Sequence, residues 1–312
     1  MSGPSIVTEQ LAPSGAQGGR FWRSTLSDYW ALTKPEVNFL ILITTAVGFY
    51  LGYGSEARPL SLVSLFNTLL GTLLVASGTG TLNQYIERDF DAQMRRTARR
   101  PAAAGRLKPR AVLAFGIALA GIGSSYLAAT VNLLASMLAV LTLLTYLFLY
   151  TPLKRKTPLC VLVGALPGAM PPLIGWAAAS GRLNSEAWTL YAILFLWQFP
   201  HFMAIAWMYR EDYDRAGYLV LPRGNVRVAF MTLETLSPLL ALVAISMVQS
   251  PVRHAAIFYC TAAVLSVGFL YFGLEFVLRR SRTAARRLLA ASIVYLPLLF
   301  VLSATLCNRA LI

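Results

Sequence analysis

Long apolar stretches separated by short polar segments make up most of the chain. A stretch of about 18 or more apolar residues can cross a bilayer as a helix, and lipid excludes most other spanning structures. The nine candidate stretches are residues 37–53, 60–86, 111–129, 132–150, 159–180, 187–208, 228–248, 254–275 and 288–306. The pattern predicts an all-α polytopic membrane protein, with a mobile cytoplasmic tail over residues 1–30 and a single transmembrane domain over residues 31–312.

The distribution of charged residues predicts how the protein is oriented in the membrane. A net charge of +14 would suggest a nucleic-acid partner if the protein were soluble. When the loops are assigned alternately to the two sides, 23 of the 27 Lys and Arg residues fall on the side of the N-terminus. Because basic residues concentrate in cytoplasmic loops, we expect a cytoplasmic N-terminus, a C-terminus on the opposite side and no nucleic-acid partner.

The densest group of charges follows the second apolar stretch. On a helix, Asn83, Glu87 and Asp91 fall on one face within an arc of about 80°. Carboxylate and amide oxygens suit Mg²⁺, which usually completes its ligands with phosphate oxygens. The arginines that follow carry forked donors for the same oxygens, so we select Arg95 and Arg96 to bind the diphosphate of an amphiphilic substrate. The alternative is an ion-pair network that anchors the helix end.

A second polar group lies at the end of the sixth apolar stretch. On one continuous helix, His201 and Asp212 would be only about 20° apart, with His201 about 16 Å deeper in the membrane. Ionisable residues at such depth are functional candidates. We therefore take Asp212 as a ligand of a second Mg²⁺, and His201 and Arg210 as substrate-binding candidates. The alternatives are a histidine hydrogen-bonded between helices and ion pairs at the surface.

Tyr146, Tyr150 and Lys154 recur every four residues at the end of the fourth stretch. The functional interpretation places two aromatic faces beneath a cation that binds diphosphate. The alternative, favoured for this segment alone, is an aromatic belt with lysines that reach the lipid headgroups. Lys34 lies on the same side, and for it we also favour headgroup anchoring over the cavity. The loop 97–109 contains helix breakers, which suit a lid or a solvated connector.

These residues carry a resemblance. Asn83-x3-Glu87-x3-Asp91 resembles the first acid-rich signature of the UbiA-type intramembrane prenyltransferases. The fuller set of motifs is similar to the branch of that family that farnesylates haem b: N-Q-Y-x-E-R-D-x-D-x-x-M-x-R-T-x-x-R-P, Y-T-P-L-K-R, P-P-L-I-G-W, and F-P-H-F followed by D-Y-x-x-A-G-Y. The resemblance covers roughly residues 30–305 and implies nine transmembrane helices around a central cavity.

The resemblance also implies a reaction. Farnesyl diphosphate would ionise, a vinyl group of haem b would be alkylated, and addition of water would give haem O for cytochrome oxidase. Asn83, Glu87 and Asp91 would bind Mg²⁺-diphosphate, and Asp212 would serve the second metal. The second signature, D-x-x-x-D, is incomplete, because Ala216 follows Asp212 at the position of the second aspartate. The setting would be the bacterial inner membrane, with the site open to the cytoplasm and a downstream haem-modifying enzyme as partner.

Side-chain chemistry suits the remaining candidates. Arg95, Arg96 and Lys154 would neutralise the leaving diphosphate together with Mg²⁺. Aromatic faces would stabilise the allylic cation, and His201 would contact the haem iron or steer the water or proton step. The aromatic candidates are Tyr146, Tyr150 and Trp197.

Two other functions compete with haem farnesylation. The first is prenyl transfer to an aromatic quinone precursor, against which Gln84, the run from Glu87 to Asp89 and His201 favour haem. The second is a non-catalytic transporter or haem-binding membrane protein, which has no use for carboxylates and arginines at both helix ends. Release of diphosphate separates the transporter from both enzymes.

Overall fold

The computed structural model describes residues 25–54, 61–224, 226–249 and 254–306. This part of the chain contains no strand, and nine helical segments in it are long and apolar enough to cross a membrane. Their bounds are α2 Pro35–Tyr53, α3 Leu62–Asp91, α4 Pro109–Thr130, α5 Leu133–Leu144 with η1 Thr145–Tyr150 and α6 Thr151–Leu153, α7 Cys160–Gly168 with α8 Met170–Ser180, α9 Ser185–Met208, α11 Val226–Ser246, α12 Ala255–Arg279 and α13 Arg282–Leu306. The predicted all-α architecture with nine spans is confirmed.

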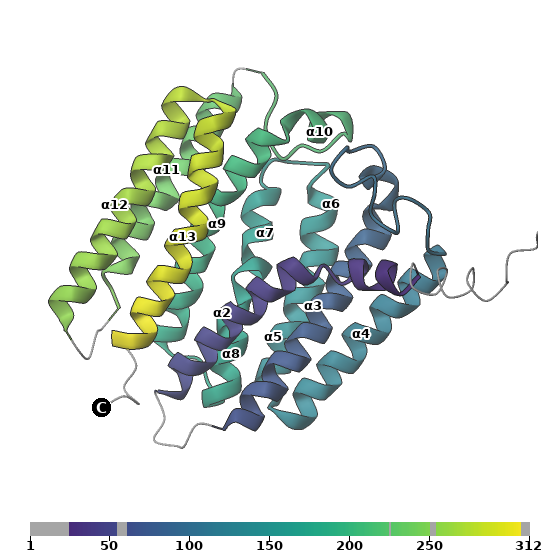
Figure 1. The fold of residues 1–312 in the computed structure, drawn as a ribbon, viewed down its shortest axis with the longest axis horizontal. Coiled ribbons are helices and arrows are strands. Elements are labelled where there is room, and N and C mark those ends of the chain that lie inside the picture. Colours follow the sequence, from purple (N-terminus) through teal and green to yellow (C-terminus); the bar gives the residue numbers. More distant parts are fainter. Residues whose placement is uncertain (1–24, 55–60, 225, 250–253, 307–312) are drawn as a thin grey trace, which may run out of the picture.

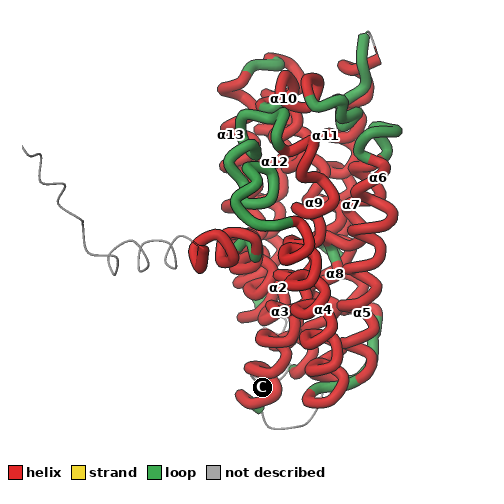
Figure 2. Tube along the Cα trace, turned by 90° about the vertical axis from the view of Figure 1, so that its right-hand side faces the viewer, coloured by secondary structure: helices red, strands yellow, loops and turns green. Residues whose placement is uncertain are grey.

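The helices stand side by side as one elongated bundle (Figures 1 and 2). Helix α3 packs along α4, α2 along α8, and α9 along α11 and α13. The last helix, α13, also contacts α2, so neighbour-to-neighbour packing runs round the bundle. The short helix α10, Arg210–Arg215, and the loop that follows α3 lie at the same end of the bundle (Figure 1), which brings the two acidic segments to one side as predicted.

The helices extend beyond the expected segments most clearly in three places. Helix α3 continues to Asp91, one turn beyond the predicted end at residue 86, because charged side chains at a membrane surface do not interrupt a helix. Helix α13 begins at Arg282 rather than at residue 288, for the same reason. Residues 25–30, assigned to the mobile tail, belong to a helix over 25–32; the rest of that tail, residues 1–24, lies outside the described residues.

Close backbone contact joins α2 to α8, the second half of the fifth span. A Cβ atom at Gly175 would overlap the carbonyl oxygen of Thr45, and one at Gly48 would overlap that of Pro172. Small residues let membrane helices approach closely enough for backbone packing. The second half of the fifth span is therefore fixed against α2.

Replacing Gly175 with alanine should lower the thermal stability of the protein in detergent, by about 1–3 kcal/mol, because the added methyl group forces α2 and α8 apart. Gly121→Ala is the control, since a Cβ there meets no atom within 4 Å. In a helix interior alanine is intrinsically favoured over glycine, so the control should unfold at the wild-type temperature or slightly above it. Equal unfolding temperatures for the two variants would contradict the packing argument.

Candidate active site

The polar face predicted for the end of α3 is present and buried. Asn83, Glu87 and Asp91 have relative exposures of 1%, 5% and 1%, and they lie on successive turns of the helix. The Asp89 side chain points away and is 75% exposed. The four-residue spacing therefore separates the two acids inside the protein from the one at the surface.

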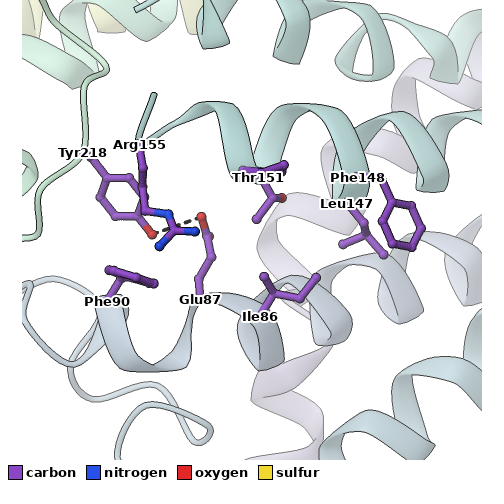
Figure 3. Close-up of a pocket in the computed structure, with 9 residues that line it drawn as sticks. Ile86, Glu87, Phe90, Leu147, Phe148, Thr151, Arg155 and Tyr218 are labelled. Atoms are coloured by element: carbon purple, nitrogen blue, oxygen red, sulfur yellow. Dashed lines mark hydrogen bonds between the residues drawn. The ribbon is translucent and has the colours of Figure 1, made fainter. Parts of the chain in front are cut away.

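Glu87 is the centre of the hydrogen-bond network. Lys154 Nζ donates to both of its carboxylate oxygens, at 2.9 and 3.1 Å. Asn83 Nδ2 donates to Oε2 at 2.9 Å, and the Tyr218 hydroxyl donates to Oε1 at 3.1 Å. The Tyr218 bond is drawn in Figure 3. This carboxylate thus joins three segments that are far apart in the sequence.

Lys154 points inward over two aromatic rings, in the arrangement of the functional interpretation. Its Nζ lies 4.5 Å from the ring centroid of Tyr150 and 5.9 Å from that of Tyr146, and the two rings are 5.1 Å apart. The preference for a lipid-facing belt with reaching lysines is therefore wrong. Burial by itself lowers the pKa of Lys154, but Tyr150 and Glu87 beside it raise that pKa well above its usual value.

The tyrosine pair owes its position to an irregular helix. Residues Thr145–Tyr150 form a π-helical turn, a feature often found at functional sites. A Cβ at Gly164 would lie 2.6 Å from ring atoms of Tyr150, so that ring occupies the space beside the glycine. The Thr151 hydroxyl donates to the carbonyl oxygen of Tyr146 at 2.9 Å and accepts a bond from Asn83 Nδ2 at 3.3 Å.

Asp91 pairs with an arginine that the sequence did not single out. Arg100 Nη1 lies 2.8 Å from Asp91 Oδ2, and that carboxylate is only 2% exposed. The loop turns back toward the helix end because the Thr97 hydroxyl donates to the Asp91 carbonyl oxygen at 2.8 Å. Arg95 and Arg96, the predicted diphosphate ligands, are both exposed, whereas Arg100 pairs with the buried carboxylate of Asp91.

Lys34 also belongs to this cluster, so the preference for headgroup anchoring is wrong. Its Nζ donates to Asn83 Oδ1 at 3.0 Å. The residue has φ +53°, a left-handed conformation just before the proline that begins α2. Burial, followed by the nearby charges of Arg100 and Lys154, lowers the pKa of Lys34 to about 7.

The second predicted acidic site is arranged differently from the expectation. Helix α9 ends at Met208, and Tyr209, with φ −110° and ψ 19°, separates it from α10. His201 and Asp212 therefore do not share one continuous helix, because the backbone changes direction between them. Asp212 is paired with Arg215 at 3.1 Å, and its side chain is 13% exposed. Arg210 packs on the Trp207 ring, with its Cζ 4.9 Å from the centroid.

The predicted metal ligands form one group and one separate residue. Within the described part of the chain, no three His, Cys, Asp or Glu side chains gather closely enough to hold a metal ion. Glu87, Asp91 and the amide of Asn83 still present hard oxygen donors of the kind Mg²⁺ prefers when phosphate oxygens complete its ligands. The oxygen donors at the end of α3 thus suit one Mg²⁺ whose remaining ligands come from an anionic substrate.

A pocket opens beside Glu87, between α3 and the segment formed by η1 and α6 (Figure 3). It has a volume of about 210 Å³. Polar groups of Glu87, Tyr218 and Arg155 lie at one end, and Leu147 and Phe148 lie toward the other. Phe148 is 67% exposed on the membrane-spanning surface, so the pocket suits an amphiphile whose apolar part extends toward lipid.

Tyr218 and Arg100 are the residues that sequence reasoning missed. Tyr218 follows Gly217, whose φ of +72° turns the chain, and the next amide, that of Leu219, donates to the Lys154 carbonyl oxygen at 2.7 Å. Both residues lie in loops, where no periodicity links a position to a helix face. The only signal for Tyr218 is its place in the motif D-Y-x-x-A-G-Y.

The fold and this site define a membrane-embedded helical protein with buried carboxylates and cations arranged for an anionic amphiphile. Comparison with known proteins agrees. The UbiA prenyltransferase family matches residues 41–303, and the chain belongs to that family. It is 44% identical to the protoheme IX farnesyltransferase of Solibacter usitatus over 282 residues, covering 88% of this chain and 97% of the relative.

Solved structures share the fold. A structure of digeranylgeranylglyceryl phosphate synthase aligns with a TM-score of 0.71 and 15% identity, covering 92% of this chain and 99% of that one. A UbiA homolog from Archaeoglobus fulgidus, bound to GPP and Mg²⁺, aligns with a TM-score of 0.60 and 13% identity, covering 86% and 99%.

Arg100 and Arg95 should differ in their effect on anion binding. We expect Arg100→Gln to weaken binding of inorganic diphosphate in the presence of Mg²⁺ by about tenfold, since a hydrogen bond to a charged group contributes about 1.5–3 kcal/mol. Arg95→Gln, at the exposed position, should stay within about twofold of wild type. Titration calorimetry on purified protein measures both, and equal losses would contradict the assignment of Arg100.

Lys34 should make diphosphate binding depend on pH. In the ligand-free protein, the Lys34 side chain is charged below about pH 7. At higher pH it is a neutral amine and must gain a proton when the anion binds, so the affinity for diphosphate should fall as pH rises. The groups that share its surroundings are Asn83, Glu87, Asp91, Arg100 and Lys154.

The Lys34→Arg variant tests this, because arginine stays charged throughout the range. The ratio of wild-type to variant affinity should fall between pH 6.5 and 8.5, a comparison that cancels the protonation of diphosphate itself. A constant ratio would show that Lys34 does not change its charge on binding.

Proposed function

We propose that the protein transfers the farnesyl group of farnesyl diphosphate to a vinyl group of haem b, with addition of water, and yields haem O and diphosphate. The observation that carries this proposal is the buried pair Glu87 and Asp91, surrounded by three cations beside two tyrosine rings. The relatives named protoheme IX farnesyltransferase supply the acceptor. In this proposal the single transmembrane domain of residues 31–312 lies in the bacterial inner membrane, and its site opens to the cytoplasm.

The cations of the site would take over the leaving group. Lys34, Lys154 and Arg100 would exchange their carboxylate or amide partners for phosphate oxygens. Glu87 and Asp91, with Asn83, would then be free to hold Mg²⁺, which neutralises charge on the departing diphosphate. Donors already placed where negative charge develops stabilise a transition state without reorganisation.

A second metal would depend on Asp212. Its carboxylate is largely buried and held by Arg215 at 3.1 Å. In the proposal Asp212 turns from that arginine toward the diphosphate when substrate binds. Because Ala216 provides no second carboxylate, Asp212 would hold this metal together with phosphate oxygens and water.

The tyrosine rings would protect the allylic cation. When the C–O bond of farnesyl diphosphate breaks, diphosphate keeps the electron pair and the farnesyl C1 carries positive charge. Tyr146 and Tyr150 present π faces, which attract cations, and the pocket between α3 and η1 accommodates part of the isoprenoid chain. The vinyl group then attacks C1, the new cation beside the porphyrin ring takes up water, and one proton is released.

The acceptor would occupy the half of the bundle that contains α9. We propose that His201 contacts the haem, with Trp197 stacked beside it at 4.5 Å. Arg210, the first residue of α10, would meet a charged group of a substrate at the membrane surface. A downstream haem-modifying enzyme would consume the product.

Purified protein incubated with Mg²⁺, farnesyl diphosphate and haem b should produce a haem whose mass has increased by one farnesyl group and one water. Glu87→Gln and Asp212→Asn should each reduce the rate by at least about 100-fold, since preorganised electrostatic groups commonly contribute that much. Asp89→Asn and Glu211→Gln are the controls, because these side chains are 75% and 80% exposed.

Removal of Mg²⁺ with a chelator should also stop the reaction, and thermal unfolding should show that each variant is folded. Unmodified haem together with diphosphate release in the presence of a quinone precursor would favour the aromatic acceptor. Absence of diphosphate release with either acceptor would favour a transporter and would overturn the proposal.

A further inference from the structure

His201 lies inside the membrane-spanning part of α9, seven residues before its end at Met208, which places it about 10 Å deep along the helix. Its ring is held on several sides. The Trp197 ring stacks on it at 4.5 Å with an interplanar angle of 28°, and Phe202 meets it edge-on at 5.7 Å. Trp197 Nε1 also donates to the Ser292 carbonyl oxygen on α13 at 2.8 Å, so the stacked pair is attached to a second helix.

The hydroxyl of Ser292 fixes which ring nitrogen carries the proton. Ser292 Oγ lies 2.6 Å from the Leu289 carbonyl oxygen and 2.8 Å from His201 Nδ1. A serine hydroxyl has one hydrogen, and a carbonyl oxygen can only accept. The hydroxyl therefore donates to Leu289, and His201 Nδ1 must donate its own hydrogen to Ser292 Oγ.

This arrangement leaves a lone pair on the other nitrogen. In a neutral imidazole with its proton on Nδ1, Nε2 is an acceptor and a metal ligand. None of the residues that the structure describes gives Nε2 a hydrogen bond. A polar atom without a hydrogen-bond partner inside the membrane is unfavourable. If His201 served only to link α9 to α13, its Nδ1 bond would be enough and Nε2 would have no role. Metal-binding histidines typically have this pattern, with the second nitrogen donating to an oxygen that orients the ring.

We propose that Ser292 is a positioning residue that holds His201 with Nε2 available to bind the iron of haem b. The inference rests on the proposed function, because that function supplies haem as the acceptor. It adds which nitrogen of His201 would bind the iron, the tautomer that leaves this nitrogen unprotonated, and Ser292 as the residue that fixes this tautomer. Ser292 has no exposed surface, so it acts on the haem only through the histidine.

The test titrates haem b into the purified full-length protein in detergent, without farnesyl diphosphate, and follows the absorption and paramagnetic-resonance spectra of the iron. Wild type should show a histidine-ligated iron. His201→Gly should lose that signature, and added imidazole should restore it. Ser292→Ala should weaken haem binding by about tenfold, the lower end expected for loss of such an orienting bond, and should alter the iron spectrum.

Ser303→Ala is the matched control. Ser303 lies on the same helix and is equally buried. Its hydroxyl oxygen lies 2.6 Å from Gln249 Oε1 and 2.9 Å from the Leu299 carbonyl oxygen, but it does not contact the histidine. This variant should keep the wild-type spectrum and affinity. The inference is overturned if wild type binds no haem, if His201→Gly keeps the wild-type spectrum, or if Ser292→Ala and Ser303→Ala behave alike.

A second measurement separates this inference from the proposed function. Haem O formation is assayed in the same wild-type preparation after addition of farnesyl diphosphate and Mg²⁺. A spectrum that depends on His201 without haem O formation would retain the iron ligand and reject the enzyme. Haem O formation with a spectrum independent of His201 would retain the enzyme and reject the iron ligand.

Discussion

The ion pair between Glu87 and Lys154 is the interaction on which the rest of the site depends. Its two side chains are only 7% and 13% exposed, at a depth where an unpaired charge is strongly unfavourable. Removing either partner would leave the other charged and buried. The same carboxylate bonds Asn83 and Tyr218, and through Asn83 it reaches Lys34. The end of α3, the end of α6, the chain before α2 and the loop after α10 are therefore held together by one charged group.

Such a network is able to serve both the free and the loaded protein. Below about pH 7, where Lys34 is charged, the three cations of the ligand-free protein exceed the two carboxylates by one positive charge, which attracts an anion. In the proposed reaction, each group would find a partner of opposite sign when diphosphate and a metal bind: Lys34, Lys154 and Arg100 would contact phosphate, and Glu87 and Asp91 would contact the metal. The exchange keeps every buried charge compensated. In this proposal, the side chains that stabilise the ligand-free protein are also those that take part in the chemistry.

Periodicity accounts for what the sequence could predict. The nine apolar stretches determine the membrane spans, and a four-residue repeat on a regular helix places Asn83, Glu87 and Asp91 on one face. Periodicity does not predict side-chain positions where the helix is irregular: Tyr209 interrupts the segment between His201 and Asp212, and a π-helical turn precedes Lys154. Arg100 and Tyr218 lie in loops whose course is set by single contacts, from Thr97 to Asp91 and from Leu219 to Lys154. Such contacts leave no repeating pattern in the sequence.

In the proposed reaction, the two halves of the bundle would present different chemistry to the two substrates. The half built on α3 and η1 gathers charge and aromatic faces, which suit an ionising diphosphate. The half built on α9 and α13 offers one imidazole whose proton is placed by a serine, which suits a neutral ligand for a metal. Helix α9 leads through α10 to Tyr218, and Tyr218 contacts Glu87, so one continuous segment joins the two halves. The hydrogen bond from Tyr218 to Glu87 thus ties the segment that follows α9 to the charged site at the end of α3.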